Sequence, residues 1–189
     1  QPLYVEAFPM TEYSMYGAVP LRTIKKALLD LKAEGRLDRV KMLTLTNCTF
    51  DGHVYNTRRV MEECLAVTPD LLFLWDEAWF GFARFSPILR PRTGLGAAAA
   101  IEAWRDSPEA LKAYEAQVAE IGENLDPTDA SLLDRRLVPD PRKIRLRVYE
   151  TNSVHKSMSA LRQASIVAVR DEDYSEHVSA FREAVFIHA

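Results

Sequence analysis

Little in this sequence points to a disulfide scaffold, a nucleic-acid partner or a membrane. Its 189 residues include two cysteines, Cys48 and Cys64, so we expect reduced thiols in the cytoplasm rather than a disulfide framework or zinc knuckle. The net charge of −3 offers no basic surface to nucleic acid or an anionic membrane. No apolar run approaches the roughly 20 residues of a membrane span. We therefore expect neither partner, and we predict no metal site.

The chain also lacks an initiator methionine and the charged and apolar regions of a signal peptide. It begins at Gln1, and a glutamine start is typical of a trimmed or excised segment. The length fits one domain or a large piece of one. We therefore expect the chain to be part of a longer protein.

Strand-like and helix-like segments alternate along the chain, which is typical of an α/β fold with a mainly parallel sheet flanked by helices. Residues 80–96 are interpreted as a long functional loop and residues 122–142 as a surface excursion. The apolar spacing predicts strands at 3–7, 40–45, 71–75, 144–149 and 166–169, and helices from Pro20 to Gly35, at 56–67, at 97–121 and at 174–187.

The continuous apolar run 71–75 suits a strand buried on both faces, as in a parallel sheet. In open α/β sheets, ligands bind at the carboxyl ends of the strands. Three polar segments follow predicted strands, namely 46–52, 76–79 and 153–156. We expect these segments to converge at one edge of the sheet and to build one site.

Asp76 directly follows the apolar run, and a carboxylate there is costly unless it has a partner. The run and Asp76 resemble a Walker B element, but no Gly-Lys pair supplies the phosphate loop that such a site needs. A helix or turn cap is the structural alternative. The remaining candidate partner is the protonated ring nitrogen of a bound cofactor.

The segment from Ser153 to Lys156 matches the S-x-x-K motif of serine β-lactamases, but the supporting S-D-N and K-T-G elements are absent. Alone, such a lysine is most often a solvated charge, and His155 a surface or core residue. A lysine that forms an imine and an aspartate that keeps the pyridine nitrogen protonated are, however, the two essentials of pyridoxal phosphate chemistry. Ser153 and His155 are suitable donors to the cofactor phosphate.

Three stretches, in the same order, resemble the bacterial-type ornithine/lysine/arginine decarboxylases. Residues 46–56, TNCTFDGHVYN, resemble the family's TNSTYDGLxYN. Residues 76–79, DEAW, with FSP at 85–87, resemble its D-x-A-W and FSP. Residues 149–156, YETNSVHK, with QAS at 163–165, are similar to its YETQSTHK and QAS. The resemblance implies the large domain of an aspartate-aminotransferase-like, fold type I protein that depends on pyridoxal 5′-phosphate.

The resemblance also implies roles for single residues. Lys156 would hold the cofactor through an imine, and Asp76 would pair with its ring nitrogen. Ala78 would pack on one face of the ring, and Trp79 would donate its indole N–H to the ring hydroxyl, the alternative being a plain core tryptophan. The phosphate would be held by Ser153 and His155, the latter being alternatively a core or supporting histidine.

The implied reaction is decarboxylation of lysine, ornithine or arginine by the full-length protein, which we expect to be at least a dimer. Another fold type I reaction, such as that of an aminotransferase or lyase, and a catalytically silent homologue remain as alternatives. Residues 97–143 exceed the connection expected in the family, so we interpret them as a helical insertion that packs outside the sheet. The family's phosphate loop and ring-stacking histidine are missing, so we expect the isolated chain to be inactive.

Overall fold

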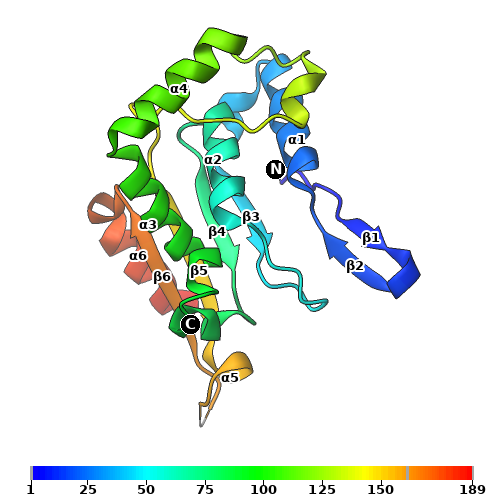
Figure 1. Cartoon of the computed structure of the whole chain (residues 1–189). Helices are drawn as coiled ribbons and strands as arrows, with labels where there is room; N and C mark the ends of the chain where they lie inside the picture. The colour runs from blue at the N-terminus through cyan, green and yellow to red at the C-terminus, as the bar shows by residue number, and fades with distance from the viewer. Residues whose placement is uncertain (1, 161, 189) are drawn as a thin grey trace.

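The computed structural model describes residues 2–160 and 162–188. It has a four-stranded mixed sheet in the order β3-β4-β5-β6, in which the first two pairings are parallel and the last is antiparallel. Helices lie on both faces of this sheet (Figure 1). The expected α/β class is therefore confirmed. The strands are β3 (Met42–Thr46), β4 (Leu72–Asp76), β5 (Arg147–Ser153) and β6 (Ser165–Asp171), and a separate hairpin contains β1 (Phe8–Met10) and β2 (Met15–Ala18).

Two helix predictions are confirmed together with their end signals. Helix α1 begins after Pro20, and Gly35 beyond its end adopts a φ of +66°, a left-handed conformation that glycine favours. Helix α2 begins after Asn56, whose side chain accepts a hydrogen bond from the backbone amide of Arg59. The helices are α1 (Leu21–Ala33), α2 (Thr57–Val67), α3 (Gly94–Arg105), α4 (Pro108–Ile121), α5 (Val154–Ser157) and α6 (Tyr174–His188).

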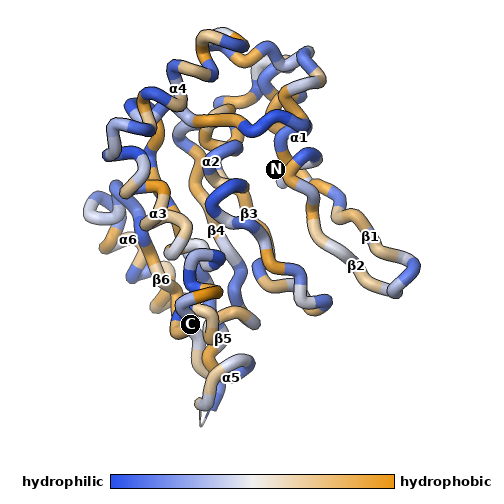
Figure 2. Tube along the Cα trace, in the orientation of Figure 1, coloured by the Kyte–Doolittle hydropathy of each residue, from blue (hydrophilic) through white to orange (hydrophobic). Residues whose placement is uncertain are grey.

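The two faces of the sheet differ in how well they are covered. Phe73 and Trp75 of β4 are buried in a core that also contains side chains of α1, α2 and α3. The alternate residues of β4 are only partly buried on the opposite face, where α6 packs beside β5 and β6 (Figures 1 and 2). The expectation that β4 is buried on both faces was therefore wrong, because one helix covers only part of that face.

Four other segment predictions need correction. Residues 3–7 form no strand; the first strand begins at Phe8 and pairs only within its hairpin. The single helix expected at 97–121 is two helices, because Pro108 has no amide hydrogen to continue α3 and instead starts α4.

The remaining two corrections concern polar segments. Residues 122–142 are not a purely external excursion, since they bury Leu125, Leu132 and Leu137 in the core. The strand expected at 144–149 is β5 at 147–153, so the polar residues up to Ser153 lie within the strand.

The loop at 80–96 contains two short 3-10 helices and the first turn of α3.

A buried ion pair ties α1 to α2. The Lys25 ammonium lies 2.7 Å from a carboxylate oxygen of Glu63, and the two side chains are 1% and 0% exposed. Lys25 also donates to the carbonyl oxygens of Leu132 and Arg135, at 2.9 and 2.8 Å. The pair thus joins two helices to the segment before β5.

We expect Lys25→Met to lower the free energy of unfolding by about 3 kcal/mol, because the buried Glu63 carboxylate then keeps only the half-exposed Arg59 as its close cation and two carbonyl oxygens lose their donor. Urea unfolding followed by circular dichroism measures this loss. The matched control is Lys26→Met on the same helix, whose pair with Asp30 is exposed and should change stability by less than about 1 kcal/mol. Equal losses for the two variants would contradict this account of the core.

Candidate functional site

The carboxyl ends of β3, β4 and β5 lie side by side at one edge of the sheet, which is at the bottom of Figure 1. Thr46 pairs with Asp76, and Asp76 pairs with Thr151, so the three strands end nearly in register. The expected convergence of the three polar segments at one edge is therefore observed. Helix α5, which contains Lys156, begins directly after β5 at this edge.

Asp76 is the last residue of β4 and is half-buried. Its Oδ1 accepts hydrogen bonds from the Ala78 amide at 3.1 Å and the Thr151 hydroxyl at 3.4 Å. Within the described residues, Oδ2 has no protein donor. Asp76 thus caps a turn, which was the structural alternative for this residue. It also keeps one oxygen available for a ligand.

Lys156 and Trp79 come from different strand ends and lie close together. The Lys156 ammonium is 5.5 Å from the centroid of the Trp79 ring, within the range of a cation–π contact. The Trp79 ring is 5.7 Å from that of Phe50, which belongs to the segment after β3. Trp79 is 38% exposed, and this exposure disfavours the alternative interpretation of Trp79 as a core tryptophan. All three loops therefore contribute to one exposed surface around Lys156.

His155 is exposed, so it is not a core histidine. Its Nδ1 lies 3.0 Å from the carbonyl oxygen and 3.3 Å from the amide nitrogen of Ala164, and these contacts join α5 to the segment before β6. Ser153 ends β5 opposite Ser165. Nearby, the buried Ser157 hydroxyl has no partner within the described residues. The α5 turn therefore offers several polar groups to a ligand.

Our sequence interpretation missed a network of buried polar groups behind the strand ends. Asn47, Glu77 and Glu150 are all at most 5% exposed. The Asn47 side-chain amide donates to Glu77 at 2.8 Å. Burial, and secondly the neighbouring Glu150 carboxylate, raise the pKa of Glu77 above its ordinary value. The sequence signal that could have revealed the burial of Glu77 was the alternation of side chains along a strand, which places Glu77 on the same face as the buried Trp75.

Asp51 has a structural role in the part of the chain that the structure describes. Its Oδ2 accepts hydrogen bonds from the amides of Tyr16 and Gly17, at 2.8 and 3.2 Å. These bonds hold the β1–β2 hairpin against the segment after β3. Thr49 accepts a bond from the His53 amide within that same segment. Both residues therefore shape the loop itself.

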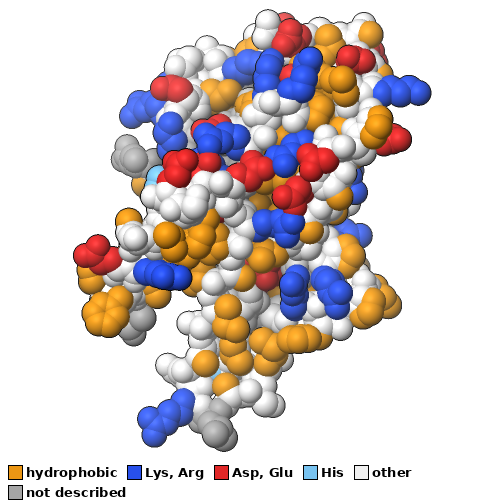
Figure 3. Space-filling view, turned by 90° about the vertical axis from the view of Figure 1, so that its left-hand side faces the viewer, with side chains coloured by type: hydrophobic (Ala, Val, Ile, Leu, Met, Phe, Trp, Pro, Cys, Tyr) orange, Lys and Arg blue, Asp and Glu red, His pale blue; other side chains and the backbone are white. Residues whose placement is uncertain are grey.

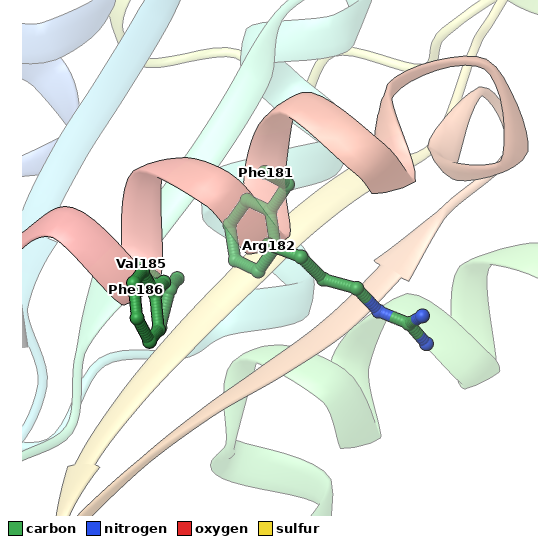
Figure 4. A pocket seen from close by; sticks show the side chains of 4 residues that line it. All are labelled: Phe181, Arg182, Val185 and Phe186. Carbon is green, nitrogen blue, oxygen red and sulfur yellow. The ribbon is translucent and has the colours of Figure 1, made fainter.

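A separate pocket of about 530 Å³ lies on the C-terminal half of α6. It is lined by Phe181, Arg182, Val185 and Phe186, and none of the candidate site residues contributes to it (Figure 4). Across the described ranges, no cluster of three or more His, Cys, Asp or Glu residues could bind a metal ion. No helix in those ranges is both long and apolar enough to cross a membrane.

Three curated proteins are similar to this chain. The biodegradative arginine decarboxylase of Escherichia coli is 30% identical over 145 residues, covering 77% of this chain and 14% of that protein. The lysine decarboxylase LdcA of Pseudomonas aeruginosa is 26% identical over 194 residues, covering 99% and 20%. The lysine decarboxylase of Hafnia alvei is 25% identical over 179 residues, covering 93% and 17%. The chain thus spans a fifth or less of the length of these relatives.

No solved structure matches this chain. The profile of the family described as "Orn/Lys/Arg decarboxylase, major domain" matches residues 1–103, which is more than half of the chain. This match includes the first two of the three stretches that carried the resemblance. The LdcA alignment extends over the third stretch as well. The chain belongs to the Orn/Lys/Arg decarboxylase major-domain family.

Proposed function

We propose that the full-length protein is a pyridoxal-phosphate-dependent decarboxylase of a basic amino acid, lysine, ornithine or arginine. One observation carries the proposal: Asp76, with a free carboxylate oxygen, ends β4, and Lys156 follows the neighbouring parallel strand β5 at the same edge of the sheet. Family membership and the printed activities of the relatives support the same reaction.

The residues at this edge fit pyridoxal phosphate. Asp76 has an oxygen left to accept a hydrogen bond from a protonated ring nitrogen. The exposed Lys156 side chain, beside Trp79, leaves its amine accessible to an aldehyde. Ser153 and His155 provide polar groups on the turn at the end of β5, where a phosphate needs donors.

When bound, pyridoxal phosphate supplies an electron sink for the pair released as the substrate carboxylate leaves as carbon dioxide. Asp76 would stabilise the positive charge on the ring nitrogen, which makes that sink effective. Lys156 would hold the cofactor covalently and release it to the substrate amine. The small side chain of Ala78 would leave room for the ring face, and Trp79 would donate its indole N–H to the ring hydroxyl.

We assign the sheet to the large domain of a fold type I protein. The parallel β3-β4-β5 arrangement, with ligand groups at its carboxyl edge, supports this assignment. Residues 97–143 would be a helical insertion. Helix α3 packs on α2 and β5 on the face opposite Asp76, and α4 continues away from the site (Figure 1).

We also propose that the full-length protein is a cytoplasmic homo-oligomer, at least a dimer. Cys48 and Cys64 are both free, which agrees with a reducing compartment. Large hydrophobic side chains are exposed on the β1–β2 hairpin, including Phe8 and Tyr16 at 69% and 83%. Exposed apolar patches of this kind often mark protein interfaces. Figure 3 shows another face, where hydrophobic side chains gather toward the end of the molecule that contains α5.

Product analysis tests the reaction. The full-length protein should be incubated with pyridoxal phosphate and, separately, with lysine, ornithine and arginine. We expect carbon dioxide and the matching diamine or agmatine from at least one substrate. A keto acid without carbon dioxide would instead support an aminotransferase. Cofactor binding without turnover of any of the three would support a catalytically silent homologue.

A further inference from the structure

Two carboxyl groups are buried together behind the strand ends. Side chains alternate along a strand, so Trp75 and Glu77 face helix α3, as do Glu150 and Asn152 on β5, while Asp76 points to the opposite face. Glu77 is 0% exposed and Glu150 is 5% exposed. Neither carboxyl group has a role in the proposed reaction, so their burial needs another explanation.

The first turn of α3 binds both carboxyl groups. The amide of Gly94 donates to Glu77 Oε1 at 2.8 Å, and the next amide, Leu95, donates to Glu150 Oε2 at 2.8 Å. Only glycine permits this approach at the first position, since a Cβ on Gly94 would lie 2.5 Å from Cδ1 of Trp75. The pair therefore connects the ends of β4 and β5 to the N-terminus of one helix, whose dipole favours negative charge.

The hydrogen-bond donors around the pair are too few for two carboxylates. Glu77 Oε1 also accepts from Asn47 at 2.8 Å, and Glu150 Oε1 accepts from Asn152 at 3.1 Å. Glu77 Oε2 is buried without a donor within the described residues.

Among the residues that the structure describes, no cation forms an ion pair with either carboxyl group. The elements packed around the pair contribute the Asn47 amide after β3, the carbonyl oxygen of the exposed Arg92 and the indole of Trp75. Within the described residues, the indole N–H has no partner. Two adjacent buried carboxylates without a cation would be strongly unfavourable.

We propose that Glu77 and Glu150 share one proton, and that this singly charged pair is the positioning group that holds the ends of β4 and β5, the Asn47 segment and helix α3 together behind Asp76. The proton lies on Glu77 Oε2, the oxygen that lacks a donor, and is directed to the Glu150 carboxylate. The link to catalysis through Asp76 rests on the proposed function, whereas the shared proton does not.

The sign of the pH dependence follows from the direction of the pKa shift. Burial and the Glu150 carboxylate raise the pKa of Glu77 to about 9. The folded protein then keeps a proton that the unfolded chain loses at its ordinary, lower pKa. The contribution of this group to stability is therefore fully present below its ordinary pKa and is lost as pH rises toward about 9, by up to about tenfold in the folding equilibrium constant per pH unit.

Thermal unfolding of the protein without cofactor, measured at a series of pH values, tests the proposal. Glu77→Gln keeps an acceptor for Asn47 and Gly94 and gives a permanent donor to Glu150. Its unfolding midpoint should be closest to that of the wild type near about pH 4, below the ordinary pKa of a glutamate side chain, and should exceed it by a growing margin toward about pH 9, so that its pH profile is flatter. The matched control, Glu115→Gln on the exposed surface of α4, should follow the wild-type profile. Parallel profiles for Glu77→Gln and the wild type would overturn the proposal.

Infrared spectroscopy gives a second readout that does not depend on a stable variant or on activity. The wild-type protein near neutral pH should show the carbonyl-stretch band of a buried protonated carboxyl group, and the band should disappear as pH rises through about 9. A wild-type spectrum without this band would overturn the proposal even if Glu77→Gln does not fold. A negative result here leaves the decarboxylase reaction untouched, because product analysis tests that reaction separately.

Discussion

Replacing Lys156 with alanine is expected to abolish both the covalent attachment of pyridoxal phosphate and the decarboxylation of a basic amino acid. The ammonium group of Lys156 is exposed beside Trp79 at the carboxyl edge of the sheet. An alanine methyl group cannot bond to an aldehyde, so turnover should fall by several orders of magnitude, to the background of free cofactor. The absorbance of the bound cofactor and the release of carbon dioxide measure the two effects.

A matched control separates this loss from a general effect of removing a lysine. Lys112 is exposed on α4, which leads away from the strand ends. Lys112→Ala should therefore retain the cofactor absorbance and the wild-type rate. The fold should survive in both variants, because Lys156 has no hydrogen bond or ion pair within the described residues. Retained turnover in a folded Lys156→Ala variant would remove Lys156 from the mechanism.

The second large effect is expected for Asp76→Asn. The amide keeps the size of the carboxylate, and its carbonyl oxygen can still accept from the Ala78 amide and the Thr151 hydroxyl. It carries no charge, however, so it cannot stabilise a protonated ring nitrogen. We expect the decarboxylation rate to fall about 10²–10³-fold, the loss typical of removing one preorganised electrostatic partner, while most of the cofactor affinity remains.

Asp70→Asn is the control for this substitution, since Asp70 is exposed at the opposite end of β4 and pairs with Arg147. It should leave the rate unchanged. Steady-state rates and a cofactor titration, measured for both variants, separate catalysis from binding. If Asp76→Asn turns over like the wild type, the free oxygen of Asp76 faces something other than the cofactor.

Local signals predicted the parts of the fold that depend on one segment. Pro20 and Gly35 indicated both ends of α1, and the apolar run predicted β4 within one residue. The break between α3 and α4 was also readable, because Pro108 with Ser107 before it is typical of a helix start. We missed this break because the alanine-rich periodicity continues across it.

Features that depend on pairing between distant segments could not be predicted in this way. Strand β5 continues through polar residues to Ser153, since its partner strands and not its own apolar pattern stabilise it. Glu77 was visible only as the residue between two motif positions. Its burial depends on α3 and on Glu150, which the strand register brings beside it. The candidate ligand groups were predictable because they follow strand ends, whereas the groups behind them were not.

Reductive trapping of the bound cofactor identifies the lysine that holds it. The full-length protein is loaded with pyridoxal phosphate, reduced with borohydride, digested and mapped by peptide mass spectrometry. The reduced cofactor should be attached to the peptide that contains Lys156, at Lys156 itself. Attachment to another lysine, or no attachment in a protein that decarboxylates its substrate, would contradict this assignment.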